Sequence, residues 1–167
     1  MSTYLATEAA LLALVRRYNA GATFTAANCL ADDWLVLDAR NTEVAAVIEM
    51  AEASAEGDNL SGHGSQGVYQ DVHKLALWIC VKRGVGVNGD GAAKATCKTL
   101  TESLKDYLRP YERLNHGAPI ARAQLGRTDA PSYISPTNDI SAATHVAQRI
   151  LLTVQCEASV VVTEPGV

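Results

Sequence analysis

The stretch that decides the fold is Tyr69–Arg83, which reads YQDVHKLALWICVKR. Its side chains alternate, so that one face of an extended strand carries Leu75, Leu77, Ile79 and Val81. The other face carries two charges, Lys74 and Lys82, beside Ala76, Trp78 and Cys80. Strands of a helix-flanked parallel sheet are buried on both faces and read as continuous apolar runs. The pattern therefore predicts a long antiparallel strand with one face on the core and the other in water.

The segment that follows, RGVGVNGDGAAKA from Arg83 to Ala95, contains Gly84-x-Gly86-x-x-Gly89. This spacing between a strand and a helix is a flag for a dinucleotide-binding loop. The preceding strand is half wet, unlike the buried strand of such a unit. A ribose-binding acid is expected about twenty residues past the last glycine, but Arg109 stands there.

We therefore interpret Gly84–Gly91 as a turn and a helix cap. Asn88, Gly89 and Gly91 are expected to supply positive φ angles, and Asp90 is expected to be the N-cap of the next helix. Its carboxylate would compete with a phosphate for the same helix pole. No cofactor is expected, although a small nucleotide-binding enzyme that uses this loop remains the alternative.

Other segments supply further strands. Period-two patterns run through Glu43–Ala53, Pro119–Arg127 and, most clearly, Val146–Cys156, whose even positions read Val, Gln, Ile, Leu, Val and Cys. A short strand is expected at Trp34–Leu37. One face of Glu43–Ala53 carries Val44, Ala46, Ile48 and Met50. Ile150, Leu152 and Val154 of the last strand are expected to share the core with the apolar face of Tyr69–Arg83: Leu75, Leu77, Ile79 and Val81.

Two amphipathic helices complete the pattern. Tyr4–Tyr18 is expected to bury a stripe formed by Leu5, Ala9, Leu12 and Val15. Gly91–Arg109 places apolar residues at steps of three and four, before Pro110 stops the helix: Ala93, Cys97, Leu100, Leu104 and Leu108. The predicted fold class is α+β, with two amphipathic helices packed on a mostly antiparallel sheet of four to five strands.

The connections are polar. Gly57–Gly67, GDNLSGHGSQG, is expected to be a long flexible hairpin loop. Thr128–Thr144 is expected to be a polar loop with two prolines. Residues 1–158 are expected to form one domain, and Ser159–Val167 an extended tail whose valines lack a partner within the chain.

No constellation points to catalysis or metal binding. The four cysteines are far apart and lack C-x-x-C spacing, so they are expected to be buried free thiols in a reducing compartment. The histidines, His63, His73, His116 and His145, have no carboxylate or cysteine at a recognised ligand spacing. The chain is therefore not expected to be an enzyme, and no catalytic, cofactor or metal residue is assigned.

Charge is unevenly distributed along the chain. The formal net charge is −4, which does not favour wrapping nucleic acid. Residues 1–67 hold three basic and nine acidic residues, whereas residues 68–167 hold eleven basic and nine acidic. Such a chain can present complementary faces to copies of itself, although solvated surface loops would give the same numbers. No apolar run approaches the ~18 residues that a membrane span requires.

Three segments carry a family resemblance: EAALLALVRRYN, VHKLALWICVKR with AAKATCKTLTESLKDYL, and ISAATHVAQRILLTVQC. Their order resembles that of the tail terminator and tail-completion (head–tail joining) proteins of long-tailed phages, over residues 4–157. The resemblance implies a virion structural protein that forms hexameric rings. These rings cap the tail tube, receive the head connector or neck protein, and meet DNA only as passing cargo. It implies no catalytic residue, no cofactor and no membrane.

Two other readings stay open beside this one. A neighbouring neck ring or head–tail adaptor would share the pattern, and an adaptor domain would bind a peptide along an exposed sheet edge. Within the ring reading, the expected assembly contacts lie in the glycine loop, in the polar loop and in the tail: Asn59, His63, Gln66, Tyr133, Val160, Val161 and Val162.

Overall fold

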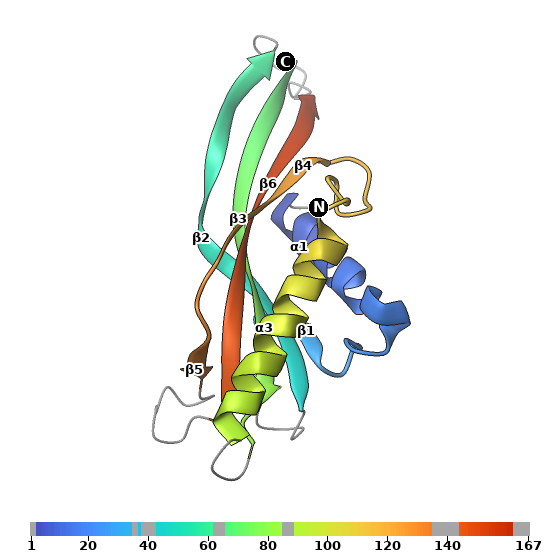
Figure 1. Ribbon diagram of the computed structural model, residues 1–167. Helices are drawn as coiled ribbons and strands as arrows, with labels where there is room; N and C mark the ends of the chain where they lie inside the picture. The colour runs from blue at the N-terminus through green and yellow to red at the C-terminus, as the bar shows by residue number, and fades with distance from the viewer. Residues whose placement is uncertain are drawn as a thin grey trace.

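The computed structural model describes residues 3–34, 37, 43–61, 66–84, 89–134 and 144–161 (Figure 1). Within these described residues, two α-helices and six strands make an α+β fold. In chain order the elements are α1 (Thr3–Arg16), the 3₁₀ helix η1 (Tyr18–Gly21), β1 (Cys29–Ala31), β2 (Val44–Ser61), β3 (Gln66–Lys82), α3 (Gly89–Leu108), β4 (Ile120–Thr128), β5 (Ser132–Ile134) and β6 (His145–Val161).

The strands form one mixed sheet in the order β1-β2-β3-β6-β4, with β5 paired to β6. Only the pair between β1 and β2 is parallel, and the other pairs in the described chain are antiparallel. The prediction of a mostly antiparallel sheet is confirmed, but its count of four to five strands is too low. Two three-residue strands, β1 and β5, are too short to give a periodic signal.

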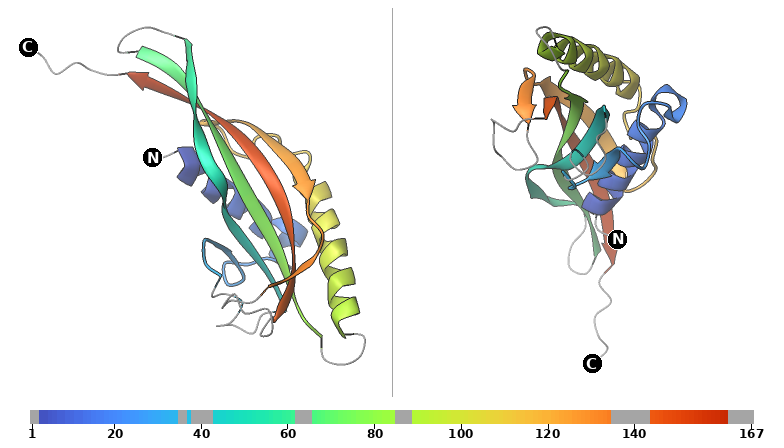
Figure 2. Two further views of the ribbon diagram at one scale, coloured as in Figure 1. Left: turned by 90° about the vertical axis from the view of Figure 1, so that its left-hand side faces the viewer. Right: turned by 90° about the horizontal axis from the view of Figure 1, so that it is seen from below.

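The main core lies between one face of the sheet and the two helices, which cover that face together (Figure 2). The alternation in β3 and β6 sets the faces as predicted, because Leu75 pairs with Leu152 and Leu77 with Ile150, and all four side chains are buried. Replacing water around these side chains with apolar contacts drives the packing of helix on sheet.

The prediction that the opposite face of the sheet lies in water is wrong along the middle of the sheet. Ala45, Val47, Cys80 and Ala147 are buried there with Leu37. The indoles of Trp34 and Trp78 pack on this cluster. Lys74 and Lys82 are exposed. The predicted water-exposed face is therefore exposed at these two lysines but largely buried between them.

The prediction of a short strand at Trp34–Leu37 is wrong. Trp34 lies in a turn, and the backbone N–H of Leu37 donates to the Trp34 carbonyl at 3.1 Å. A hydrogen bond of this span closes a turn, and the nearby strand is β1 instead. The polar loop expected at Thr128–Thr144 likewise contains the short strand β5.

The two helices differ in how well their buried faces were predicted. In α3, Ala93, Cys97, Leu104 and Leu108 are buried as expected. In α1 the predicted stripe is wrong for Ala9, which is exposed, and for Leu5, which is 52% exposed. Val15 is buried as expected, and Leu12 packs partly buried against the core. The sequence of α1 is apolar around most of its circumference, so helical spacing alone did not select the face. The buried residues are Ala6, Thr7, Ala10, Leu11, Leu14 and Val15.

β2, β3 and β6 run on past the helices as a curved three-stranded extension (Figures 1 and 2). Most of the expected Gly57–Gly67 loop is strand, since β2 continues to Ser61 and β3 begins at Gln66. The expected tail is also partly strand, because Ser159–Val161 pair with Gln66–Val68. Pairing with neighbouring strands outweighs the weak strand propensity of glycine and serine here.

All four cysteines are buried and free, as predicted. Burial raises the pKa of the Cys29 thiol, and that of Cys97, to about 11, which keeps both protonated near neutral pH. Within the described residues, no helix is both long enough and apolar enough to cross a membrane.

Candidate assembly interface

The glycine segment is built for close backbone packing. Gly84 and Gly89 approach so closely that a Cβ added to Gly89 would lie 2.5 Å from the backbone of Gly84. Only glycine tolerates that approach. The expected positive φ angles are wrong for Gly89 and Gly91, which lie in α3; Asn88 is outside the described residues. α3 begins one residue before Asp90, so Asp90 lies in its first turn rather than at the N-cap.

The Asp90 carboxylate is engaged within the chain. Arg83 donates from Nε and Nη2 to its two oxygens at 3.0 and 2.9 Å, which lowers the pKa of Asp90. The Tyr133 hydroxyl donates to the same carboxylate at 3.3 Å. A phosphate at this helix start would therefore meet an anion that already holds the nearby guanidinium.

Tyr133, one of the predicted assembly contacts, joins β5 to this cluster. The Arg83 guanidinium lies 4.9 Å from the centre of its ring, and the Lys94 ammonium lies 4.7 Å from it. Cations over an aromatic face are attracted by its quadrupole. Tyr133 is still 38% exposed, so its contact with another subunit stays a prediction, while its first role is to hold β5 against α3.

The other predicted contacts fall in or near the three-stranded extension. Asn59 pairs with Tyr69, and Gln66 pairs with Val161. Val160 pairs with Gly67, so the expectation that the tail valines lack a partner within the chain is wrong for Val160 and Val161. For the four predicted contacts Asn59, Gln66, Val160 and Val161, the structure describes only the backbone. His63 and Val162 lie outside the described residues.

Among the described histidines, His73 sits in the most developed polar cluster. The Thr3 hydroxyl donates to Asp71 Oδ2 at 2.6 Å and lies 2.9 Å from His73 Nε2. A hydroxyl has a single hydrogen, so Thr3 accepts from His73 Nε2–H. That tautomer cannot take a proton from Thr3, and the contacts stabilise the junction of α1 with β3. His145 is buried beside Thr144, and His116 is exposed; in the described chain no metal-binding group forms.

One outer edge of the sheet is acidic. We define the acidic edge as residues 29–34 and 43–61, which form β1, its following turn and β2. It holds seven carboxylates and no lysine or arginine: Asp32, Asp33, Glu43, Glu49, Glu52, Glu56 and Asp58. Burial raises the pKa of Tyr4, and the carboxylates of Glu8, Asp32 and Glu49 raise it further. Arg16 reaches this edge from α1, where it donates to the Cys29 carbonyl.

The opposite outer edge is basic. We define the basic edge as residues 105–128, which run from the last turn of α3 through β4. It holds five cations, Lys105, Arg109, Arg113, Arg122 and Arg127, against two acids, Asp106 and Glu112. Arg109 is paired with Asp106 at 3.1 Å, and both side chains are about two-thirds exposed. The sheet order places β1 and β4 at opposite ends.

The two edges also differ in how the backbone is covered. β1 pairs with β2 only up to Ile48, where the Asp32 N–H donates to the Ile48 carbonyl at 2.8 Å. From Met50 to Ser61, no strand of the described chain lies on the outer side of β2. On the basic edge, the Ala123 N–H of β4 donates a hydrogen bond to the Glu112 carbonyl, so this part of the strand edge is covered. An uncovered strand edge is a template for pairing with another chain.

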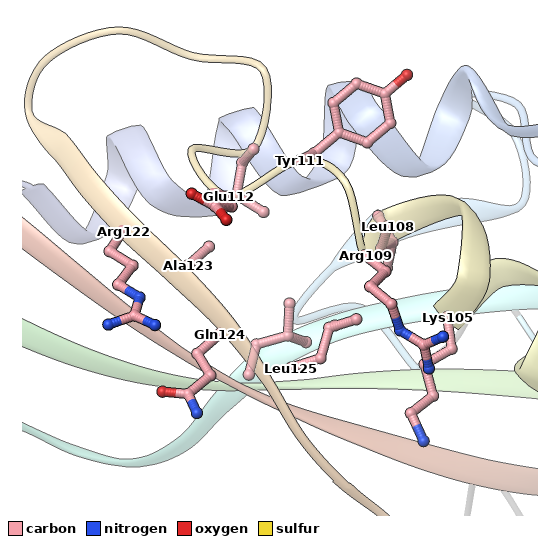
Figure 3. A pocket seen from close by; sticks show the side chains of 11 residues that line it. Lys105, Leu108, Arg109, Tyr111, Glu112, Arg122, Ala123, Gln124 and Leu125 are labelled. Carbon is pink, nitrogen blue, oxygen red and sulfur yellow. The ribbon is translucent and has the colours of Figure 1, made fainter.

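A cavity of about 260 Å³ opens on the basic edge, between the end of α3 and β4. Figure 3 shows Arg122 and Gln124 on one side, Lys105 and Arg109 on the other, Leu125 between them, and Glu112 above. Its floor is apolar and includes Leu108, Leu114 and Leu152. The site joins a hydrophobic floor to a mostly cationic rim.

No protein-family model matches the chain, and no curated protein sequence matches it either. The candidate site therefore stands on the geometry alone. The excess of acids in residues 1–67 was the sequence signal for the charged edges. No sequence signal indicated the cavity, because its lining comes from three separate segments.

Proposed function

We propose that the chain is the subunit of a homo-oligomeric ring in a phage virion, and that the ring is a tail terminator. The observation that carries the assembly is the opposite charge of the two outer sheet edges. Because one outer edge is acidic and the opposite edge is basic, the acidic edge of one copy can contact the basic edge of the next copy, head to tail. Such heterologous contacts generate rings when the rotation closes.

Electrostatic complementarity at this contact selects orientation. Pairing the acidic edge with the basic edge of the next copy brings opposite charges together, whereas acidic-to-acidic or basic-to-basic contacts are repulsive. The contact therefore excludes the isologous two-fold dimer through either edge. The extension of β2, β3 and β6 then projects from the body of each copy in the same sense, available to a further ring or a tube.

The assignment to a tail terminator rests on the resemblance in element order, and the α+β architecture is compatible with it. In this role the ring caps the tail tube and receives the neck protein, while DNA passes through. A neighbouring neck or head–tail adaptor ring would use the same edges. An adaptor domain is a second candidate, favoured by the uncovered outer side of β2 beyond Ile48, where an extended peptide could add a strand.

The first experiment is the native mass of the purified chain, combined with negative-stain images. The expected result is a discrete species of about six times the 17.7 kDa subunit mass, seen as rings. Rings mixed with isolated tail tubes should bind at tube ends only. A monomer at all concentrations would contradict the ring, and rings that ignore tube ends would favour a neck ring.

A further inference from the structure

We infer that the cavity on the basic edge is the socket for Met50 of the adjacent copy. This inference rests on the proposed ring and names the residue that would anchor its interface. Met50 is 42% exposed, and with Leu5 and Tyr133 it belongs to the few large hydrophobic side chains that the described surface exposes. It lies on β2 just past Ile48, where cover by β1 ends.

The socket suits one apolar side chain better than a small molecule. At about 260 Å³ it falls below the ~300–1,000 Å³ of typical ligand pockets. Its floor combines buried Leu108, Leu114 and Leu152 with partly buried Leu125. Methionine is flexible and polarizable, fills irregular apolar gaps, and is enriched at protein interfaces.

The surroundings of Met50 and of the socket are complementary in charge. Met50 lies on β2, whose sequence holds four carboxylates and no basic residue: Glu49, Glu52, Glu56 and Asp58. The socket is rimmed by Lys105, Arg109 and Arg122, opposed by Glu112. Interaction hot spots are side chains that fill well-packed pockets and are ringed by contacts that exclude water.

A second copy is the occupant that this geometry favours. Met50 and the socket lie on opposite outer edges of one sheet, separated by β3 and β6. The side chain therefore cannot fill the socket of its own chain. The contact repeats from copy to copy in one direction, as a closed ring requires.

The test is disulfide cross-linking in the full-length chain with Met50→Cys and Gln124→Cys combined. Gln124 is exposed and lines the socket, and the four native cysteines are buried. Mild oxidation should give a ladder of covalent oligomers up to the full ring. The matched control combines Met50→Cys with Thr99→Cys, because Thr99 is exposed on α3 away from the socket. This pair should stay monomeric on a denaturing gel.

Native mass separates the possible failures. Rings that form without a cross-link in the Met50→Cys, Gln124→Cys variant would contradict the proposed insertion of Met50 into the socket but would agree with the proposed ring. A wild-type chain that is monomeric would overturn both. As a second measurement, Met50→Asp should weaken assembly at least tenfold while Met50→Leu assembles as wild type; equal assembly of the two variants would also overturn the socket.

Discussion

The indole rings of Trp34 and Trp78 meet edge to face, with their centres 5.5 Å apart. Both indole N–H groups donate to Glu49, Trp34 to Oε2 at 2.9 Å and Trp78 to Oε1 at 2.7 Å. The Arg149 guanidinium lies 5.3 Å from the centre of the Trp78 ring. One carboxylate thus ties the segment after β1 to the middle of β2 and β3, and it fixes the inner boundary of the acidic edge.

Glu49→Gln is expected to destabilise the fold by about 1–3 kcal/mol, because an amide offers one acceptor oxygen and leaves one indole N–H facing a donor. Chemical denaturation followed by tryptophan fluorescence measures the change. Glu43→Gln, which removes the same charge one residue before β2 begins, is the control. Equal effects of the two substitutions would mean that charge, rather than the paired indoles, sets the stability.

Leu152→Ala is expected to cost about 2–5 kcal/mol of unfolding free energy, because Leu152 is 2% exposed in the main core. Thr153→Ala, one residue along β6 and facing the other way, should cost far less. Urea melts of dissociated subunits give both numbers. Similar costs would contradict the period-two assignment of faces in β6.

Stability should depend on pH through His73. Burial lowers the pKa of His73 below its usual 6.5, although the Asp71 carboxylate opposes this effect. The unfolded chain therefore takes up this proton at higher pH than the folded chain does. The free energy of unfolding should fall as the pH drops below about 6.5, and this contribution should level off below the folded pKa.

His73→Gln is the matched control for that titration, because the amide can still donate to the Thr3 hydroxyl but does not titrate. Thermal melts between pH 7.5 and 5 should show a shallower slope for the variant than for the wild-type chain. Parallel slopes would show that other groups carry the pH dependence.

Two truncations distinguish the role of Ser159–Val161, which pair with β3, from that of residues 162–167. Deleting residues 162–167 should leave the melting temperature nearly unchanged while reducing ring formation, if this segment is an assembly arm. Deleting residues 159–167 should also lower the melting temperature, because Ser159–Val161 pair with β3. Calorimetry and native mass measure both effects. Normal rings from the shorter deletion would make residues 162–167 dispensable for assembly.

The sequence was most informative where one physical signal dominated. In β3, β6 and α3, a single apolar face met a polar one, so spacing alone identified the core. It failed in α1, where nearly every position is apolar, and in Gly57–Ser61, where local turn propensity gave way to pairing with β3. The start of α3 was predicted two residues too late, at Gly91 instead of Gly89, because helix ends depend on contacts such as that of Asp90 with Arg83, which lies outside the helix.

The candidate interface could be predicted only in outline. The excess of acids in residues 1–67 indicated complementary faces. Which strands carry them to the outer edges depends on the sheet order, which places β6 between β3 and β4. No local pattern encodes that order, since it results from long-range pairing.

Reversing the charge of each edge, separately and together, tests the central claim most directly. One variant carries Asp32→Lys and Asp33→Lys on the acidic edge, a second carries Arg122→Glu and Arg127→Glu on the basic edge, and a third carries all four changes. Native mass at equal concentration should show subunits for the first two variants and restored rings for the third, because reversal of both edges makes them complementary again. Rings from either single-edge variant, or a third variant that is folded but does not assemble, would contradict the head-to-tail contact between the two edges.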